Sequence, residues 1–298
     1  MKIWCQWADL RIPPTFELDV RPIGELSSAE LAEIDIYIPK YMGGAATLTP
    51  ITQMTKLKWV QLLTAGYEDA IPHLRPGIQL FNARGVHDFS TAELTTAMVL
   101  AHLTGLPGYL SDMRSGYWRT SQRDSIYQKK IAIIGAGSVG GKIGEFLAPF
   151  NVEITFFARS ARPGVRSISE LNDAIGSFDV VILIVPLTKE TRHLIGKEQL
   201  KLVRDGALLV NVARGGVVDT DALLAELKSG RISAALDVTD PEPLPSEHEL
   251  WRLSNVLITP HVGGNSAAFE PQAKEFLFRQ LTALAKGEAM SNQIEWES

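Results

Sequence analysis

The second half of the chain alternates apolar runs with amphipathic segments. The apolar runs, which predict buried strands, cover residues 129–137, 152–158, 178–186, 206–213, 232–238 and 255–260. Segments with helical spacing of apolar residues lie between them, at 140–150, 167–175, 197–203 and 219–230. Apolar strands that alternate with helices are typical of a parallel sheet covered on both faces. The pattern therefore predicts an α/β fold with a doubly wound parallel sheet.

The first ninety residues carry a weaker form of the same pattern. Short apolar strands are expected at 2–7, 34–39, 58–63 and 78–83, separated by polar or helical stretches. Residues 91–113 have helical spacing with few breakers until Gly105 and Pro107, which predicts a helix, and an interdomain or dimer contact is the role we expect for it. A final amphipathic helix is expected at 266–288. We predict a domain of residues 91–264 and a second, smaller α/β domain made of residues 1–90 and 265–298.

Composition narrows the class of protein. Of 298 residues, 45% are hydrophobic and 21% charged, which is ordinary for a globular chain, and the net charge of -5 argues against a nucleic-acid partner. The one cysteine, Cys5, excludes an intrachain disulfide and a cysteine zinc site, and we expect no metal. Charges and prolines interrupt the N-terminus, and the longest apolar run, 180–187, is far short of the about 20 residues that span a bilayer. We expect a cytoplasmic protein without a membrane partner.

A glycine motif joins the first strand of the predicted 91–264 domain to its helix. Gly135, Gly137 and Gly140 have the spacing G-x-G-x-x-G directly after a strand, the context that gives the motif meaning. Gly135 would permit a tight turn, Gly137 the approach of a pyrophosphate, and Gly140 close packing of the helix. The helix N-terminus, with Ser138 and Val139, would offer free N–H groups to that anion. The motif predicts a Rossmann-type dinucleotide site; the alternative is a tight turn without a ligand.

The next strand ends in arginines. In this fold an acid about 20 residues beyond the glycines binds the ribose 2′-hydroxyl of NAD. Here no Asp or Glu occurs between Glu153 and Glu170, and Arg159, Ser160 and Arg162 follow the strand. A guanidinium pairs with the 2′-phosphate of NADP, which a carboxylate would repel. The loop therefore favours NADP(H), with NAD(H) possible; a merely solvated basic loop is the alternative.

Three later strands end in charged residues. Arg214 and His261 each follow a predicted strand, Asp237 lies at the end of another, and Glu242 lies in the proline-rich loop behind Asp237. Ligands of open α/β sheets bind at the carboxyl ends of the strands. An arginine can hold a carboxylate at two points, and a carboxylate beside an imidazole orients it and stabilises its protonated form. Together these residues predict reduction of a 2-oxo acid, although a lone histidine is more often structural.

Five segments resemble the successive signatures of the D-isomer-specific 2-hydroxyacid dehydrogenases. They are GAGSVGGKIGEFLAPF, VPLTKETRHLIG, NVARGGVVD, ALDVTDPEPLP and ITPHVGG, which together cover about residues 128–265. The resemblance implies that His261 is the acid/base, Glu242 its partner, and Arg214 the ligand of the substrate carboxylate and carbonyl. It implies that Asp237 binds the nicotinamide carboxamide. Further cofactor-binding residues implied by these segments are Pro186, Thr191, Ala213 and Gly263.

The N-terminal part matches the family more loosely. LLTAGYEDA resembles the family's substrate loop, which implies that the backbone N–H groups of Ala65 and Gly66 bind the substrate carboxylate. Tyr67, where an aliphatic residue is common, would narrow the pocket. Trp118 resembles a tryptophan that reaches a neighbouring subunit's site, with a simple packing role as the alternative. Thr239 also departs from the family pattern, since an aromatic residue is common there.

The resemblance implies a function and its alternatives. Residues 1–90 with 265–298 would form a flavodoxin-like substrate-binding domain, and residues 91–264 the dinucleotide-binding domain. The arginines match the branch that resembles NADPH-dependent glyoxylate and hydroxypyruvate reductases, so we expect reduction of a short 2-oxo acid to the D-2-hydroxy acid by a homodimer. The alternatives are an NAD-dependent D-3-phosphoglycerate dehydrogenase and, in a different class, a nucleotide-sensing binding module.

Overall fold

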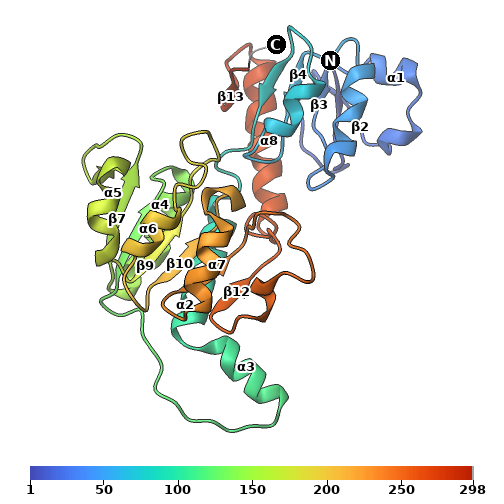
Figure 1. The fold of residues 1–298 in the computed structure, drawn as a ribbon. Helices are drawn as coiled ribbons and strands as arrows, with labels where there is room; N and C mark the ends of the chain where they lie inside the picture. The colour runs from blue at the N-terminus through green and yellow to red at the C-terminus, as the bar shows by residue number, and fades with distance from the viewer. Residues whose placement is uncertain (297–298) are drawn as a thin grey trace. The chain divides into compact units, whose positions relative to one another are not determined.

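The computed structural model describes residues 1–296, which form two compact units. The central unit comprises residues 88–266; the split unit comprises residues 1–87 together with the chain from residue 267 onward. Each unit contains one sheet with its own core. Both are drawn in Figure 1.

The central unit is built on a seven-stranded parallel sheet in the order β12-β11-β10-β9-β6-β7-β8. Its strands are β6 (Lys130–Ile134), β7 (Glu153–Ala158), β8 (Val165–Ser167), β9 (Val180–Leu183), β10 (Leu208–Asn211), β11 (Ser233–Leu236) and β12 (Val256–Ile258). Its helices are α2 (Asp88–Leu103), α3 (Leu106–Arg114), α4 (Ser138–Leu147), α5 (Leu171–Ala174), α6 (Lys197–Leu202) and α7 (Thr220–Lys228). Counted from β6, this is the Rossmann order, whose direction reverses between β6 and β9. The predicted doubly wound sheet is confirmed.

Alternate residues of each central strand face opposite layers of helices. Ile131 and Ile133 of β6 pack in one apolar cluster with side chains of α2 and α4. Ala132 and Ile134 pack in the other, with side chains of α6 and α7. Because successive side chains of a strand point to opposite faces, a strand covered on both sides must be apolar throughout. This explains why β6 and β9 read as continuous apolar runs.

The split unit contains a six-stranded sheet in the order β13-β5-β4-β3-β1-β2. Its strands are β1 (Lys2–Trp4), β2 (Glu17–Asp19), β3 (Ile36–Tyr37), β4 (Trp59–Gln61), β5 (Gln79–Phe81) and β13 (Gln293–Ile294), and its helices are α1 (Ser28–Ala32) and α8 (Phe269–Ala285). The first five strands pair in parallel in the order 2-1-3-4-5, and β13 joins β5 antiparallel. That order is flavodoxin-like, as predicted. Helix α8 packs its apolar face on β1 and β3.

Short 3₁₀ helices complete the chain. They cover Ile23–Glu25, Ala45–Thr47, Thr49–Gln53, Glu68–His73, Ala148–Phe150, Ile168–Glu170, Ile175–Ser177, Gly215–Val217 and Glu249–Arg252. Among residues 1–296, no helix has both the length and the apolar character needed to cross a membrane.

One predicted helix is wrong in its extent. Residues 91–113 form two helices, because Gly105 adopts a left-handed conformation (φ +69°) that ends the first, and Pro107 occupies the first turn of the second. No residue of α3 is buried, and Figure 1 shows α3 and the segment after it extending away from the central sheet. The central unit therefore carries an exposed arm, residues 106–125.

Candidate active site

The glycine turn lies between β6 and α4 at the carboxyl edge of the central sheet. Gly135 has a φ of +120°, and a Cβ there would lie 2.1 Å from the carbonyl oxygen of Ile184. A Cβ on Gly140 would lie 1.9 Å from the carbonyl oxygen of Gly135, so α4 packs directly on the turn. Gly137 differs, since a Cβ there would meet no atom within 4 Å. Two of the glycines are thus required by the fold itself, and the third leaves open space.

The start of α4 offers unused hydrogen-bond donors. Gly137 is the N-cap residue and provides no side-chain cap. Within residues 1–296, the backbone N–H groups of Ser138, Val139 and Gly140 donate to no acceptor. The Ser138 hydroxyl donates to Asp88 at 3.3 Å. Free N–H groups at the positive end of a helix beside an open glycine could hold the pyrophosphate of a dinucleotide.

The arginines after β7 have different partners. The Arg162 guanidinium donates to the carbonyl oxygen of Ala136 at 2.6 Å, which places Arg162 against the glycine turn. Arg159 and Ser160 are exposed at the end of β7. Arg166 instead pairs with Glu170 at 3.0 Å. The structure therefore brings Arg162 to the predicted cofactor site, whereas Arg166 is paired with Glu170.

An acid that the sequence analysis did not consider lies near Arg159. Glu190 has a lowered pKa, chiefly because the Thr188 hydroxyl donates to its carboxylate at 2.7 Å, and the positive charge of Arg159 contributes. In the same loop the Thr191 hydroxyl donates to the carbonyl oxygen of Pro186 at 2.6 Å. The basic loop after β7 therefore faces a carboxylate from the β9 side. Sequence alone gives no sign of this, because the two segments meet only in the folded sheet.

Arg214 follows β10 in extended conformation and is half-buried. Asn211, which is 1% exposed, accepts from the backbone N–H of Ala213 at 3.1 Å and donates to the Arg214 carbonyl at 3.0 Å, which fixes the turn. One Arg214 nitrogen donates to the Ala213 carbonyl at 2.7 Å. Over the described part of the chain, the other guanidinium N–H groups have no acceptor. They remain available to an anionic ligand.

Glu242 and His261 lie in direct contact. The Nδ1 atom of His261 is 2.6 Å from a carboxylate oxygen of Glu242, and the two side chains are 41% and 40% exposed. Within residues 1–296, the Nε2 atom of His261 has no hydrogen bond, and neither residue shares a hydrogen bond or an ion pair with Arg214. The structure thus brings two of the three predicted catalytic residues into contact. Arg214 stands at the neighbouring strand end, where Gly215 packs under the backbone of Thr239.

Asp237 holds the turn that carries His261. Its carboxylate accepts from the Thr259 hydroxyl at 2.6 Å and from the backbone N–H groups of Val262 and Gly263, each at 2.9 Å. Its carbonyl accepts from the backbone N–H of His261 at 2.8 Å. Asp237 is 2% exposed. This holding role was missed from the sequence; its predicted contact with nicotinamide stays a prediction.

In the split unit, the loop after β4 contains carbonyl groups that accept hydrogen bonds and two backbone N–H groups that donate none within the described residues. The carbonyl oxygens of Thr64, Ala65 and Gly66 accept from Ala83 N, the Asn82 amide and the Thr64 hydroxyl, at 2.8, 2.7 and 2.7 Å. Throughout residues 1–296 the backbone N–H groups of Ala65 and Gly66 find no acceptor. Tyr67 instead donates its backbone N–H to Glu68 at 2.9 Å. We name residues 64–67 the amide loop.

Trp118 lies in the exposed arm and is 92% exposed, so it does not pack within its own chain. The arm has its own internal contacts, because Arg119 pairs with Asp112 of α3 at 2.7 Å.

The ring of His87 stacks on Phe269 at 5.0 Å, and its Nε2 lies 2.8 Å from the Leu63 carbonyl.

Comparison with known proteins gives consistent matches. The model of the family described as D-isomer specific 2-hydroxyacid dehydrogenase, NAD binding domain, matches residues 96–263. A glyoxylate reductase of Pyrococcus horikoshii is 36% identical over 250 residues, covering 78% of this chain and 75% of that protein. A D-3-phosphoglycerate dehydrogenase of Methanocaldococcus jannaschii is 30% identical over 276 residues, covering 89% of this chain and 52% of that protein. A crystal structure of a D-isomer specific 2-hydroxyacid dehydrogenase family protein from Aeromonas salmonicida superposes with a TM-score of 0.86 at 25% identity, covering 96% and 93% of the two chains.

Fold and comparisons together define an α/β oxidoreductase with a dinucleotide-binding sheet. The chain belongs to the D-isomer-specific 2-hydroxyacid dehydrogenase family, which confirms the resemblance found in its motifs.

Proposed function

We propose that the protein reduces a short 2-oxo acid, such as glyoxylate or hydroxypyruvate, to the D-2-hydroxy acid with a hydride from NADPH. The observation that carries the proposal is the 2.6 Å contact between His261 and Glu242 at the carboxyl edge of the sheet that bears the glycine turn. The relative from P. horikoshii is named a glyoxylate reductase, which supports the same class of substrate.

His261 would supply the proton. A nicotinamide dinucleotide, when bound, would supply a hydride for the carbonyl carbon, and the carbonyl oxygen must then gain a proton to become a hydroxyl. The Nδ1 of His261 is engaged by Glu242, which leaves Nε2 as the atom that donates. The adjacent carboxylate holds the ring in a fixed orientation. General acid catalysis of this kind is worth about 10²–10⁴-fold in rate.

Arg214 and the amide loop would bind the substrate's polar groups. The free guanidinium N–H groups of Arg214 suit the substrate carboxylate and the carbonyl oxygen on which charge develops. The free N–H groups of Ala65 and Gly66 suit a carboxylate, because successive unpaired amides make an anion-binding concavity. Tyr67, at the end of this loop, would limit the length of the substrate.

Arg159, Ser160 and Arg162 would bind the 2′-phosphate of NADPH. The contact of Arg162 with the glycine turn supports this, since that turn is where a dinucleotide's pyrophosphate would bind. Glu190 weakens the positive field at Arg159, so we expect a preference for NADPH rather than exclusion of NADH.

A D-3-phosphoglycerate dehydrogenase activity is the second candidate. The 30% identity to the M. jannaschii enzyme favours it, although this chain spans 52% of that protein. Its substrate carries a phosphate, which would need additional cations.

A parallel absorbance assay tests the proposal. Purified protein is mixed with glyoxylate or hydroxypyruvate, and oxidation of NADPH and NADH is followed separately. We expect fast loss of NADPH and slower loss of NADH. Loss of NADH alone would refute the role of the arginines, and oxidation of 3-phosphoglycerate with NAD in place of both reactions would favour the second candidate. No turnover with any 2-oxo acid would refute the proposed activity.

A further inference from the structure

Three amide side chains are buried in the core of the split unit. Gln61 at the end of β4 is 1% exposed, Asn82 after β5 is 7% exposed, and Gln280 of α8 is 3% exposed. Burial of an amide costs free energy unless its hydrogen bonds are satisfied, and an apolar side chain would fill the same space without that cost. Their presence therefore calls for a reason other than packing.

Hydrogen bonds link the three residues in a series, here called the amide series, which passes through the backbone of residue 82. Gln280 donates from Nε2 to the Gln61 side-chain oxygen at 3.0 Å. Gln61 donates from Nε2 to the backbone carbonyl of Asn82 at 3.1 Å. Asn82 then donates from Nδ2 to the carbonyl of Ala65 at 2.7 Å, in the amide loop. The amide series joins helix α8 to the amide loop across the ends of the neighbouring strands β4 and β5.

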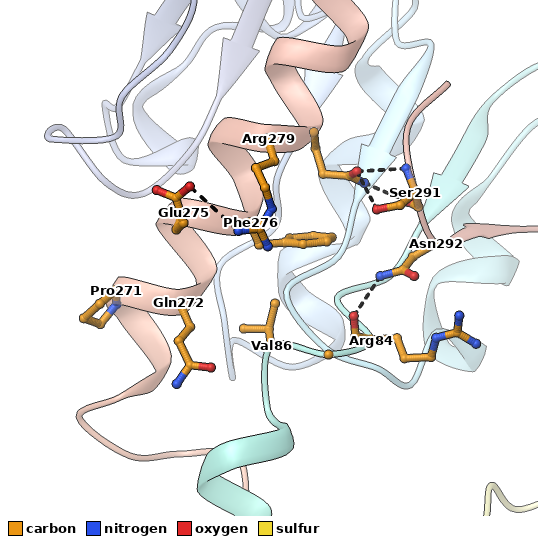
Figure 2. A pocket seen from close by; sticks show the side chains of 11 residues that line it. Arg84, Val86, Pro271, Gln272, Glu275, Phe276, Arg279, Ser291 and Asn292 are labelled. Atoms are coloured by element: carbon orange, nitrogen blue, oxygen red, sulfur yellow. Dashed lines mark hydrogen bonds and ion pairs between the residues drawn. The ribbon is translucent and has the colours of Figure 1, made fainter. Parts of the chain in front are cut away.

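The Gln280 end of the amide series lies at the wall of a cavity of about 560 Å³, whose lining also includes Ser291, Asn292 and Arg84. Gln280 accepts from the backbone N–H and the hydroxyl of Ser291, at 2.9 and 2.8 Å. Asn292 donates its side-chain amide to the Arg84 carbonyl at 2.8 Å. Figure 2 shows these bonds as dashed lines around Ser291 and Asn292. The segment before β13 thus fixes the orientation of the Gln280 amide.

The Asn82 end of the amide series determines which groups the amide loop presents to a ligand. Asn82 occupies the Ala65 carbonyl, and its own side-chain oxygen accepts from the Arg84 N–H at 3.2 Å, so the amide can turn in only one way. The carbonyls of residues 64–66 each accept a hydrogen bond from inside the unit, whereas the N–H groups of Ala65 and Gly66 have no acceptor within residues 1–296. An apolar residue at position 82 would fill space but would not impose that orientation.

We propose that Asn82 is a positioning residue for the binding of the substrate carboxylate, and that Gln61 and Gln280 hold Asn82 in place. The proposal rests on the proposed function, in which the amide loop binds that carboxylate. Hydrogen bonds to a charged group are worth enough that loss of their alignment weakens binding by roughly tenfold to a hundredfold. The carboxylate is held before and during the reaction alike, so the loss falls on KM and leaves kcat nearly unchanged.

The test is a double-substitution cycle. Asn82→Leu should raise KM for glyoxylate at least tenfold, with kcat and the dissociation constant for NADPH within about twofold of the parent. Gln280→Met should raise KM by a smaller factor in the parent and by none in the Asn82→Leu background, because the side-chain bond from residue 82 to the amide loop is then already lost. Gln272→Met is the matched control: Gln272 lies on the same helix and lines the same cavity, and its side chain has no hydrogen bond within residues 1–296. It should change nothing.

A second measurement does not depend on activity. In ¹⁵N spectra of the free protein, Gln280→Met should shift the amide signals of Ala65 and Gly66, and Gln272→Met should leave them in place. If the parent reduces no 2-oxo acid but these signals shift, the proposed function is refuted, while the coupling of Gln280 to the amide loop is supported. Unchanged signals of Ala65 and Gly66 in Gln280→Met would overturn the proposal. So would a double variant in which the KM effects of Asn82→Leu and Gln280→Met simply multiply. Should Asn82→Leu fail to fold, Gln280→Met alone decides by the same two readouts.

Discussion

At the scale of single residues, His261 is the most direct test of the chemistry. Its Nδ1 contacts Glu242 and its Nε2 is free within the described residues 1–296, the arrangement of a proton donor with an orienting partner. His261→Ala should lower kcat by about 10²–10⁴-fold while the dissociation constant for NADPH stays nearly constant. Stopped-flow turnover and a fluorescence titration measure the two quantities.

The control is His73→Ala, because His73 is a partly exposed histidine of the split unit whose ring makes no hydrogen bond or ion pair within residues 1–296. Parent-like kcat in His261→Ala would remove His261 from the mechanism. Glu242→Gln should lower kcat less than His261→Ala, since the amide oxygen can still accept from Nδ1 and orient the ring, whereas alanine at position 261 removes the proton donor itself.

Substitutions of Arg159 and of Glu190 should change the affinity for NADPH in opposite directions. Arg159→Ala should weaken NADPH binding by about tenfold or more, because a charge-assisted hydrogen bond to phosphate is lost, and should leave NADH binding nearly unchanged. Glu190→Gln removes a negative charge close to Arg159 and should strengthen NADPH binding by a few fold. Calorimetric titration with both dinucleotides measures these changes. Equal losses for NADPH and NADH in Arg159→Ala would show that this arginine does not read the 2′-phosphate.

At the scale of elements, the glycine turn separates a structural requirement from a binding one. A Cβ at position 140 would lie 1.9 Å from the Gly135 carbonyl, so Gly140→Ala forces α4 off the turn and should lower the free energy of unfolding by about 1–3 kcal/mol. A Cβ at position 137 meets no protein atom within 4 Å, so Gly137→Ala should leave stability unchanged and weaken dinucleotide binding. Thermal unfolding and a binding titration of both variants test the pair. Unchanged dinucleotide affinity in Gly137→Ala would show that no ligand approaches there.

The long apolar elements were predictable from sequence, and the short ones were not. Strands β6 and β9 are buried on both faces, so their sequences are apolar over their whole length after the first residue of β6. Strand β8 (Val165–Ser167) is half-buried at the sheet edge and only three residues long, with an arginine in the middle, which leaves no apolar run to detect. Strands β2 and β13 were missed for the same reason, and the division of residues 91–113 into α2 and α3 depended on the backbone of Gly105.

The candidate site was predictable where it depends on strand ends. Parallel strands bring their carboxyl ends to one edge, so Glu242 and His261 could be expected near each other, and their contact is 2.6 Å. The amide series leaves no such signal in the sequence, because Gln61 and Gln280 are separated by 219 positions. In a sequence, glutamine and asparagine are typical of the surface, and only the folded structure shows that these are buried.

At the scale of the whole molecule, the exposed arm (residues 106–125) predicts self-association, as the family resemblance suggested. Met113, Tyr117 and Trp118 are 68%, 62% and 92% exposed, and Leu106 and Leu110 of α3 are also exposed. Exposed apolar side chains gathered on one element mark an interaction surface. Internal contacts such as Arg119–Asp112 and the bond between the Tyr109 and Ser121 hydroxyls give the arm a defined shape before it meets a partner. We therefore expect a homodimer formed through this arm.

The oligomeric state tests this expectation. Light scattering should give the parent twice the chain mass of 32.7 kDa. Met113→Glu places a charge on the apolar arm, where burial against a second chain would cost several kcal/mol, so this variant should be monomeric. Met42→Glu is the control, since Met42 is an exposed methionine, at 60%, outside the arm. A monomeric parent would refute the dimer, whereas a parent and a Met113→Glu variant that are both dimeric would place the interface elsewhere. If Trp118 reaches the partner's site, Trp118→Ala should raise KM in a protein that remains dimeric, because the substrate pocket loses a wall while the remaining apolar contacts hold the two chains together.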